Sequence, residues 1–281
     1  MRPSPRPIAR ITHHGRAVRV AEVACRAGKH DRPYDETHDA FCVALVRRGS
    51  FSYRDRATGR LHQLREGWLL LGRPGRVFAC AHAHDGGDDC VCLEVDTAVV
   101  EDVARHTPGA RGELFEAAVL PPSPRASAWI AALALDADVD EVGHAVVRAA
   151  LGRTPSARVE PSRTDRDRVM AAMSIIESRT TQPLALAELA AEVGLSPFHF
   201  LRVFRRATGT TPHRYLVGAR LRRAASLLAD TSRPVTDIAY DAGFGDLSNF
   251  VRTFHREVGC SPGAYRRGRL PAAAALAPDR G

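Results

Sequence analysis

The first third of the chain carries short apolar runs separated by turn residues. Three β-rich runs stand out in residues 39–55, 59–84 and 88–95: "DAFCVALVRRGSFSYRD", "GRLHQLREGWLLLGRPGRVFACAHAH" and "DDCVCLEV". Glycine-containing turns punctuate them, as expected between strands. Strands at this close spacing are typical of a small barrel or sandwich. The pattern therefore predicts a β-barrel domain over residues 1–96.

From residue 97 to 151 the pattern becomes alanine-rich and helical. The last part of this segment has an apolar stripe near helical spacing. Such a stripe can pack on the barrel, or it can form a dimerisation helix, and the sequence favours neither interpretation strongly. The stripe consists of Val139, Val142, Val146, Val147 and Leu151.

A linker and a second domain follow. Residues 152–164 contain two prolines and few large apolar side chains, which indicates a linker. Residues 165–269 are helical in pattern throughout, and residues 270–281 are expected to be a disordered tail. The predicted fold class is therefore α+β, with an N-terminal barrel, intervening helices and a C-terminal all-α domain.

The C-terminal domain contains one helical unit twice. "VGLSPFHFLRVFRRATG" (193–209) and "AGFGDLSNFVRTFHREVG" (242–259) share apolar and basic positions. Gly194 suits the left-handed end of a first helix, and Ser196 followed by Pro197 suits the start of a second. Asp246 is the corresponding N-cap in the second copy. A helix, a tight turn and a second helix define a helix-turn-helix, so the domain is predicted to hold two.

The second helix of each unit has two different faces. One is apolar and should be buried: Phe200, Val203 and Phe204, matched by Phe250, Thr253 and Phe254. The other mixes arginine with apolar residues, which suits a DNA major groove, where Arg binds guanine and apolar groups touch thymine methyls. Burial of its apolar members against other helices is the alternative. This second face holds Phe198, Leu201, Arg202 and Arg205 in the first copy and Leu247, Ser248, Val251 and Arg252 in the second.

The segment between the copies predicts their spacing. "TPHRYLVGARLRRAASLLAD" has Thr211 as expected N-cap and an apolar stripe behind it. About 17 helical residues give a rod of about 25 Å. Such a rod can hold two helices about one DNA turn apart. The two copies are therefore predicted to read two successive major grooves.

Charge supports a polyanionic partner. The whole chain carries +8 and has a pI near 9.7. Residues 165–269 contain sixteen Arg against ten Asp and Glu, so +6 of that charge lies in the repeated helical part.

Residues 165–269 resemble the DNA-binding domain of the AraC/XylS family of bacterial transcriptional regulators. The resemblance rests on "DIAYDAGFGDLSNFVRTF" and the closing "GCSPGAYRR". It implies a monomer-competent reader of double-stranded promoter or operator DNA, with RNA polymerase as a further partner, and a cupin-like N-terminal domain that senses a small effector and in some members dimerises. The 139–151 helix favours a homodimer for this chain. The family often has a polar residue where Leu201 and Leu247 stand, which puts hydrogen-bond readout at those positions in doubt.

A cysteine and histidine cluster marks the N-terminal domain. In "FACAHAHDGGDDCVC", alternation would place Cys80, His82 and His84 on one face of a strand. Thiolate and imidazole ligands suit tetrahedral Zn²⁺ or another soft-to-borderline metal ion. A thiol switch of Cys80 with Cys90, or an organic effector beside a structural cluster, are the alternatives. The ligand candidates are Cys80, His82, His84 and Cys90, with Cys25 and His38 behind them; Cys42 and Cys92 are expected to be inert core thiols.

Other classes of function fit less well. No Ser-His-Asp order, P-loop or dinucleotide glycine pattern is visible, and Glu36-Thr37-His38 departs from the ligand pattern of cupin enzymes. A cupin-type metalloprotein or enzyme with an accessory DNA-binding domain is the alternative, and metal storage leaves the doubled unit unexplained. No apolar run approaches the roughly 18–20 residues of a membrane span, and the N-terminus lacks a signal-peptide pattern. We expect a cytoplasmic regulator that is not an enzyme.

Overall fold

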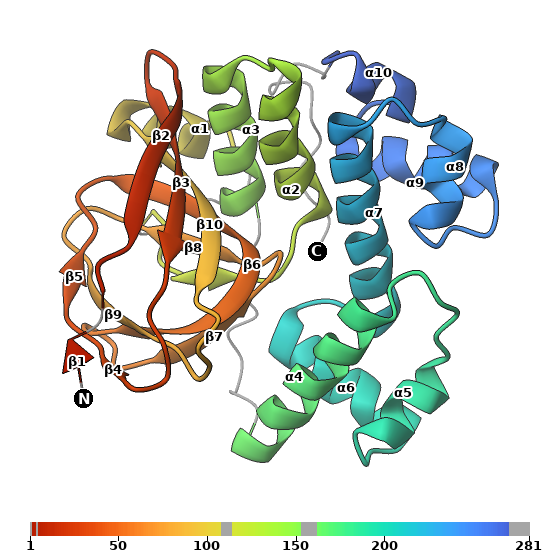
Figure 1. The fold of residues 1–281 in the computed structure, drawn as a ribbon, viewed down its shortest axis with the longest axis horizontal. Coiled ribbons are helices and arrows are strands. Elements are labelled where there is room, and N and C mark those ends of the chain that lie inside the picture. The colour runs from red at the N-terminus through yellow and green to blue at the C-terminus, as the bar shows by residue number, and fades with distance from the viewer. Residues whose placement is uncertain (1, 4, 108–113, 153–161, 270–281) are drawn as a thin grey trace.

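The computed structural model describes residues 2–3, 5–107, 114–152 and 162–269, with a β-rich N-terminal part beside a helical C-terminal part (Figure 1). This arrangement confirms the predicted α+β fold class. The strands of the N-terminal part are β1 (Arg2–Pro3), β2 (Ile8–His14), β3 (Val18–Cys25), β4 (Asp31–Arg32), β5 (Glu36–Thr37), β6 (Phe41–Asp55), β7 (Leu61–Arg65), β8 (Leu69–Gly72), β9 (Val77–Ala81), β10 (Asp88–Val95) and β11 (Val119–Leu120).

The long strand β6 organises the sheet. Its first half pairs antiparallel with β10 on one side and β8 on the other, and its second half pairs with β7 and β9. Beyond these neighbours the order runs β11-β8-β6-β10-β3-β2, and β5 joins β9. Because β6 serves both halves, the sheet curls around an interior, as Figure 1 shows. Val43, Leu69 and Leu93 of β6, β8 and β10 belong to the core shared with the helices. Ala44, Leu70 and Cys90 of the same strands line a cavity in the interior.

Helices cover one face of this sheet. They are α1 (Thr97–Arg105), α2 (Pro124–Ala131), the 3₁₀ turn η1 (Ala132–Leu135) and α3 (Val139–Leu151). The predicted helical segment 97–151 is interrupted by β11, which pairs with β8 and was not expected from the sequence. Strand pairing explains this difference, because a two-residue strand leaves no periodic signal.

The apolar stripe of α3 lies in the core of the N-terminal domain. Val142, Val146 and Val147 are fully buried in the same cluster as β3, β6 and β10. Gly143 permits this close packing, since a Cβ there would lie 2.3 Å from Cγ2 of Val18. The packing interpretation is therefore the one realised. In this conformation Val142, Val146 and Val147 are not accessible to a second copy, whereas Val139 and Leu151 are half-buried.

The C-terminal domain consists of two helical units at opposite ends of one long helix (Figure 1). The first unit lies at one end of α7 and the second at the other, and α7 contacts both. At about 1.5 Å per residue, the 19 residues of α7 span about 28 Å. The helices are α4 (Arg163–Ser178), α5 (Leu186–Glu192), α6 (Pro197–Thr208), α7 (Pro212–Asp230), α8 (Val235–Asp241), α9 (Leu247–Val258) and α10 (Pro262–Arg266).

The helix ends follow the capping signals in the sequence. The side chain of Ser196 accepts a hydrogen bond from the His199 N–H at the start of α6, and Asp246 does the same for α9. Both helices end at a glycine in the left-handed region, Gly209 and Gly259. The predicted inner faces, Phe200, Val203, Phe204, Phe250, Thr253 and Phe254, are all buried.

The linker is shorter than the sequence indicates. Helix α4 begins at Arg163, with Ser162 as its N-cap, so the helical domain starts inside the segment 152–164. The predicted tail 270–281 and most of the predicted linker lie outside the described residues. Among the helices of the described ranges, none combines the length and apolar character that crossing a membrane requires.

Candidate nucleic-acid interface and internal cavity

Helices α6 and α9 present similar outer faces. Arg202 on α6 and Arg252 on α9 occupy equivalent positions, and both side chains are exposed. Within the described ranges neither arginine forms an ion pair with a carboxylate; Arg252 lies 3.4 Å from the Asn249 side-chain oxygen. Each second helix therefore offers an unneutralised guanidinium to an anionic or hydrogen-bonding partner.

The other predicted contact residues divide into two groups. Phe198, Arg205 and Ser248 are exposed, and Phe198 is 79% accessible, which is unusual for a large apolar side chain. Leu201 is half-buried. Leu247 and Val251 are also half-buried and pack against the apolar core around α7, α8 and α9. Burial against other helices, the alternative raised from the sequence, therefore accounts for part of the surface of these last two residues.

The N-terminal domain contacts both helical units. Arg125, in the first turn of α2, donates to the main-chain carbonyl of Glu257 at 3.1 Å and lies 3.5 Å from that of Arg256, in the last turn of α9. The hydroxyl of Tyr265 donates to the carbonyl of Ala128 at 2.7 Å. On the other unit, Arg65 donates to the carbonyl of Met170 in α4 at 3.3 Å. Changes in the N-terminal domain can thus reach both ends of α7.

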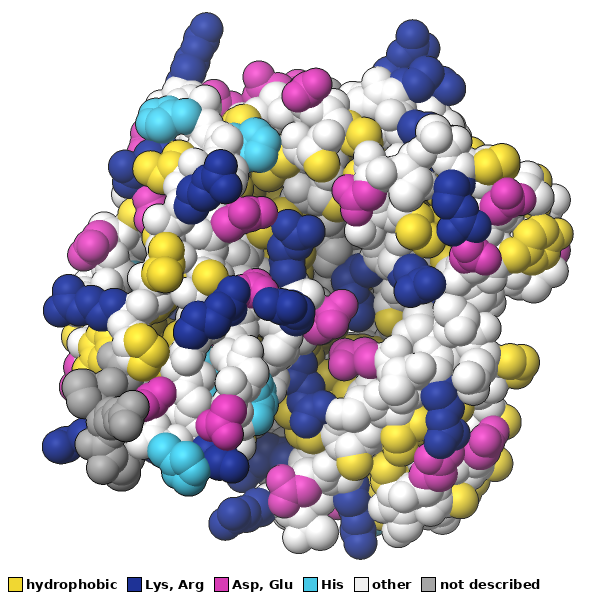
Figure 2. Space-filling model, in the orientation of Figure 1, with side chains coloured by type: hydrophobic (Ala, Val, Ile, Leu, Met, Phe, Trp, Pro, Cys, Tyr) yellow, Lys and Arg dark blue, Asp and Glu magenta, His cyan; other side chains and the backbone are white. Residues whose placement is uncertain are grey.

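A hollow separates the two parts of the molecule elsewhere. It has a volume of about 520 Å³, and charged groups of both signs line it, among them Arg47, Glu66, Glu177, Arg222 and Arg223. Figure 2 shows the hollow between the N-terminal part and the C-terminal helices, with basic and acidic side chains around it. Mixed charge at this scale gives no preference for an anionic or a cationic ligand.

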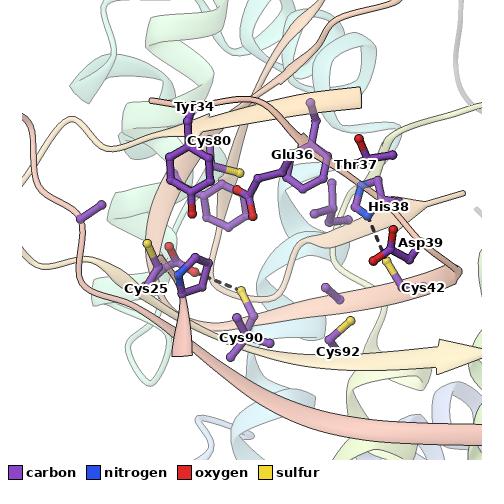
Figure 3. A pocket seen from close by; sticks show the side chains of 18 of the residues that line it. Cys25, Tyr34, Glu36, Thr37, His38, Asp39, Cys42, Cys80, Cys90 and Cys92 are labelled. Atoms are coloured by element: carbon purple, nitrogen blue, oxygen red, sulfur yellow. Dashed lines mark hydrogen bonds between the residues drawn. The ribbon is translucent and has the colours of Figure 1, made fainter. Parts of the chain in front are cut away.

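A second cavity, of about 260 Å³, lies inside the curled sheet. Strands β3, β6, β8, β9 and β10 and the segment around β5 supply its walls. Figure 3 shows sulfur, imidazole and carboxylate groups projecting into this one space, with Cys25 and Cys90 toward one end of the view and His38 and Cys42 toward the other. The lining is apolar over much of its area and carries these ionisable groups in addition: Cys25, Tyr34, Glu36, His38, Asp39, Cys42, Cys80, His82, Asp88, Cys90, Cys92 and Glu94.

At one end three metal-ligating side chains meet. One ligand atom from each of Cys25, His82 and Asp88 lies within 4.8 Å of the other two. Nε2 of His82 is 2.6 Å from Oδ1 of Asp88, while its Nδ1 is buried with no hydrogen-bond partner among the described residues. Burial disfavours protonation of His82, but Asp88 and Cys25 outweigh it and raise the pKa of His82 to about 9. Asp88 and Cys25 therefore favour the protonated form of the His82 imidazole.

The remaining predicted ligands are spread around the cavity. Cys90 donates its thiol to Oδ2 of Asp88 at 3.2 Å, next to the three-residue cluster. Cys80 and His38 line the same cavity but are not members of that cluster. His84 does not line it: Nε2 of His84 lies 2.8 Å from the Ser50 hydroxyl. Strand β9 ends at Ala81, so the alternation that would align His84 with Cys80 stops before it.

Sequence reasoning did not identify Asp88 as a member of this cluster. Asp88 opens β10 and is paired with Cys25 in the ladder between β10 and β3. It follows the tight turn containing Gly86 and Gly87, and Gly87 has a positive φ of 63°. The signal available in the sequence was an aspartate directly after a glycine-rich turn. Its burial and its pairing with Cys25 are known only from the structure.

At the other end of the cavity Cys42 meets an imidazole. The Sγ of Cys42 lies 3.6 Å from Nδ1 of His38. Cys92 and the main chain of Gly72 also act on this thiol, and together with His38 they lower its pKa. Sequence reasoning treated Cys42 and Cys92 as inert core thiols; the structure instead places both in the cavity wall, with Cys42 in a polar contact.

Comparison with known proteins supports the reading of the C-terminal part. Residues 189–268 match the family model described as a helix-turn-helix domain. Over 94 residues the chain is 40% identical to the HTH-type transcriptional activator RhaS of Klebsiella pneumoniae (strain 342), covering 34% of each protein. Over 92 residues it is 36% identical to the right origin-binding protein of Escherichia coli (strain K12), covering 33% of this chain and 32% of that protein.

One solved structure is similar to part of the chain. A transcriptional regulator from Chromobacterium violaceum, described as an AraC-type DNA-binding domain-containing protein, aligns with 37% of this chain and 93% of its own, at 30% identity and a TM-score of 0.36. The chain spans about a third of the length of these two curated relatives, a transcriptional activator and an origin-binding protein. The C-terminal domain of this chain is therefore similar to the helix-turn-helix domains of AraC-type regulators.

Proposed function

We propose that the chain is a DNA-binding transcriptional regulator in which α6 and α9 enter two successive major grooves. The observation that carries the proposal is the pair of equivalent exposed arginines, Arg202 and Arg252, on two capped helices at the ends of α7. A length of about 28 Å for α7 is close to the ~34 Å repeat of successive major grooves on one side of a duplex. The charge of +6 on residues 165–269 favours contact with phosphates.

Selection of bound duplexes from a random-sequence DNA library tests this proposal. The full-length protein is expected to enrich sites with two preferred blocks whose centres are about one helical turn, roughly 10–10.5 base pairs, apart. Enrichment of a single block, or of no sequence preference, would contradict reading by two helices. RNA polymerase and a second copy of the chain are further partners that we propose for the regulator on its promoter.

We further propose that the cavity of the N-terminal domain binds the effector, and that a soft or borderline divalent cation such as Zn²⁺ is one ligand it accepts. Cys25, His82 and Asp88 would hold the ion, and their thiolate, imidazole and carboxylate donors are ones that zinc uses. His82 is buried beside Cys25 and Asp88, and this placement supports the fit. Bound there, a cation would lie next to the Asp88 carboxylate, which favours a positive charge at this place.

Elemental analysis of the protein, purified under reducing conditions without chelator, tests the metal proposal. We expect close to one zinc or similar ion per chain, retained through gel filtration. Protein that carries no ion as isolated and takes up none on dialysis against micromolar zinc would contradict it. The contacts of Arg125, Tyr265 and Arg65 with the helical units give a route by which occupancy of the cavity can alter DNA binding.

A further inference from the structure

The sulfur of Cys42 is surrounded by hydrogen-bond donors. Nδ1 of His38 lies 3.6 Å away; Gly72 is adjacent to the sulfur, Cys92 lines the same cavity wall, and both favour the thiolate. These groups come from three separate places in the fold: the segment after β5, the end of β8 and the middle of β10. A neutral thiol is a weak acceptor and needs no such set of partners, whereas a thiolate is stabilised by each of them.

The surrounding residues hold this arrangement in place. A Cβ on residue 72 would lie 2.4 Å from the Cys42 sulfur and 2.5 Å from Nδ1 of His38, so Gly72 is what leaves room for the contact. The His38 ring stacks on Phe78 with centroids 4.2 Å apart, and its Nε2 lies 3.4 Å from the Tyr53 hydroxyl. The imidazole is therefore fixed on three sides with one nitrogen directed at the sulfur.

Cys42 differs in this respect from the other cysteines of the cavity. The hydrogen bond from Cys92, with those from His38 and Gly72, outweighs burial and lowers the pKa of the Cys42 thiol. Burial and nearby carboxylates instead raise the pKa of Cys80 and Cys90. Cys80 and Cys90 therefore stay protonated at neutral pH, and the thiol switch considered for them from the sequence lacks a reactive thiolate.

A second thiol lies beside this sulfur. Cys92 is on β10, which pairs with β6 so that Cys92 is opposite Ala44 and Cys42 is opposite Glu94. The two cysteines are thus diagonal neighbours on the same face of the sheet, and both line the cavity. A reactive thiolate with a hydrogen-bonded second thiol is the arrangement in which oxidation can be completed as a disulfide.

From this geometry we infer that Cys42 is a peroxide-reactive cysteine and that Cys92 is its resolving partner. The Cys42 thiolate attacks the terminal oxygen of a hydroperoxide; the S–O bond forms as the O–O bond breaks, and the departing oxygen takes a proton from His38. The Cys92 thiol then attacks the sulfenic acid, the S–S bond forms, and water leaves. The two thiols lose two electrons, and the hydroperoxide is reduced to an alcohol, or to water if it is hydrogen peroxide.

Disulfide formation at this place would strain the sheet. A diagonal pair must close from hydrogen-bond contact to an S–S bond of about 2.05 Å, which draws β6 and β10 toward each other. β6 continues toward β7, and Arg65 at the end of β7 contacts α4 of the first helical unit. An effect of oxidation on DNA binding rests on the proposed function. The thiol chemistry itself is independent of that function.

Peptide mass spectrometry of the full-length protein tests the chemistry directly. Reduced protein is exposed to a few equivalents of hydrogen peroxide, quenched with iodoacetamide and digested. We expect a disulfide that joins the peptides of Cys42 and Cys92, and Cys42 alkylated at least about tenfold faster than Cys260 in the unoxidised protein. Oxidation spread evenly over the cysteines, or confined to others, would overturn the inference. This experiment uses the wild-type chain, so variant folding does not enter.

Variants then separate the two roles. Cys92→Ser is expected to leave a sulfenic acid on Cys42 that dimedone traps, and Cys260→Ser, which changes a buried thiol outside the cavity, is expected to behave like wild type. A dimedone adduct missing from Cys42 in a folded Cys92→Ser protein would overturn the assignment. DNA binding is measured on the same samples. If neither redox state binds DNA specifically, the proposed function is contradicted. The presence or absence of the disulfide tests only the assignment of Cys42 and Cys92.

Discussion

The guanidinium of Arg125 joins the N-terminal domain to the end of a recognition helix: its Nε donates to the Glu257 carbonyl at 3.1 Å. The last carbonyls of a helix have no partner within the helix, and a cation near them also meets the negative end of the helix dipole. Arg125 is only 9% exposed, and the carbonyls of Glu257 and Arg256 are among the groups that its guanidinium meets. The position of α9 is therefore tied to α2.

Arg125→Ala should destabilise the protein. Removal of a buried, charged donor leaves carbonyls of α9 without their partner, which we expect to lower the free energy of unfolding by about 1.5–3 kcal/mol. Chemical denaturation with urea measures the change. Arg105→Ala, which removes an exposed arginine of α1 that pairs with Asp102, is the matched control and should change stability little. Equal stabilities for the two variants would show that the contact between α2 and α9 contributes nothing.

Gly72→Ala should disrupt the contact between Cys42 and His38. The added methyl group would lie 2.4 Å from the Cys42 sulfur, so the thiol or the imidazole must move. We expect a loss of about 1–3 kcal/mol in stability, together with slower alkylation of Cys42. Gly245→Ala is the control, because a Cβ at residue 245 meets nothing within 4 Å. Alkylation of Cys42 at the wild-type rate in folded Gly72→Ala protein would contradict the described role of Gly72.

Sequence periodicity and capping signals were sufficient to predict the helix faces and helix ends of the C-terminal domain. The inner faces of α6 and α9 were predicted residue by residue, because the helix period, Ser196, Asp246 and the two terminal glycines Gly209 and Gly259 all agree. These are local signals, and each lies within a few residues of the helix that it specifies.

The arrangement of residues in the cavity could not be predicted from the sequence, because it depends on contacts between residues that are distant along the chain. His82 and Asp88 meet because the strand ends at Ala81 and the chain turns back at Gly86 and Gly87, whereas strand alternation wrongly aligned His84 with Cys80. The contact of Cys42 with His38 needs the empty space at Gly72, thirty positions further along the chain. Strand ends and such long-range spaces become visible only in three dimensions.

Alkylation of Cys42 should persist at low pH. A depressed pKa means that the thiolate is present above that pKa and is lost only as pH falls through it, so the rate at pH 6 should remain close to the rate at pH 8. The groups that act on this pair are His38, Cys92, Tyr53 and Glu94. A pH series of iodoacetamide labelling, read by peptide mass spectrometry, measures the profile.

His38→Gln supplies the control for that profile. Loss of the imidazole removes one donor to the sulfur, so the midpoint of the alkylation profile should move to higher pH. A merely structural role of His38 would lower the stability and leave the midpoint where it is. A wild-type rate that falls in proportion to hydroxide concentration below pH 8 would indicate an ordinary thiol.

Cys25→Ser should abolish or weaken zinc binding. The substitution replaces a thiolate ligand by a hydroxyl of similar size, and zinc binds a neutral hydroxyl far less well. Equilibrium dialysis with zinc gives the stoichiometry and affinity. Cys260→Ser is the matched control, because Cys260 lies in the core of the helical domain. Equal zinc binding by both variants would place the ion elsewhere.

The central claim is that α6 and α9 each read one block of the DNA site. It is tested most directly by measuring binding of the site selected by wild-type protein. The variants Arg202→Ala and Arg252→Ala are compared with wild type and with the control Arg105→Ala. Each recognition-helix variant is expected to lose about 1–3 kcal/mol of binding free energy and to relax base preference in a different one of the two blocks, while Arg105→Ala does neither. Unchanged affinity and preference in both variants, or relaxation of the same block by both, would contradict the account.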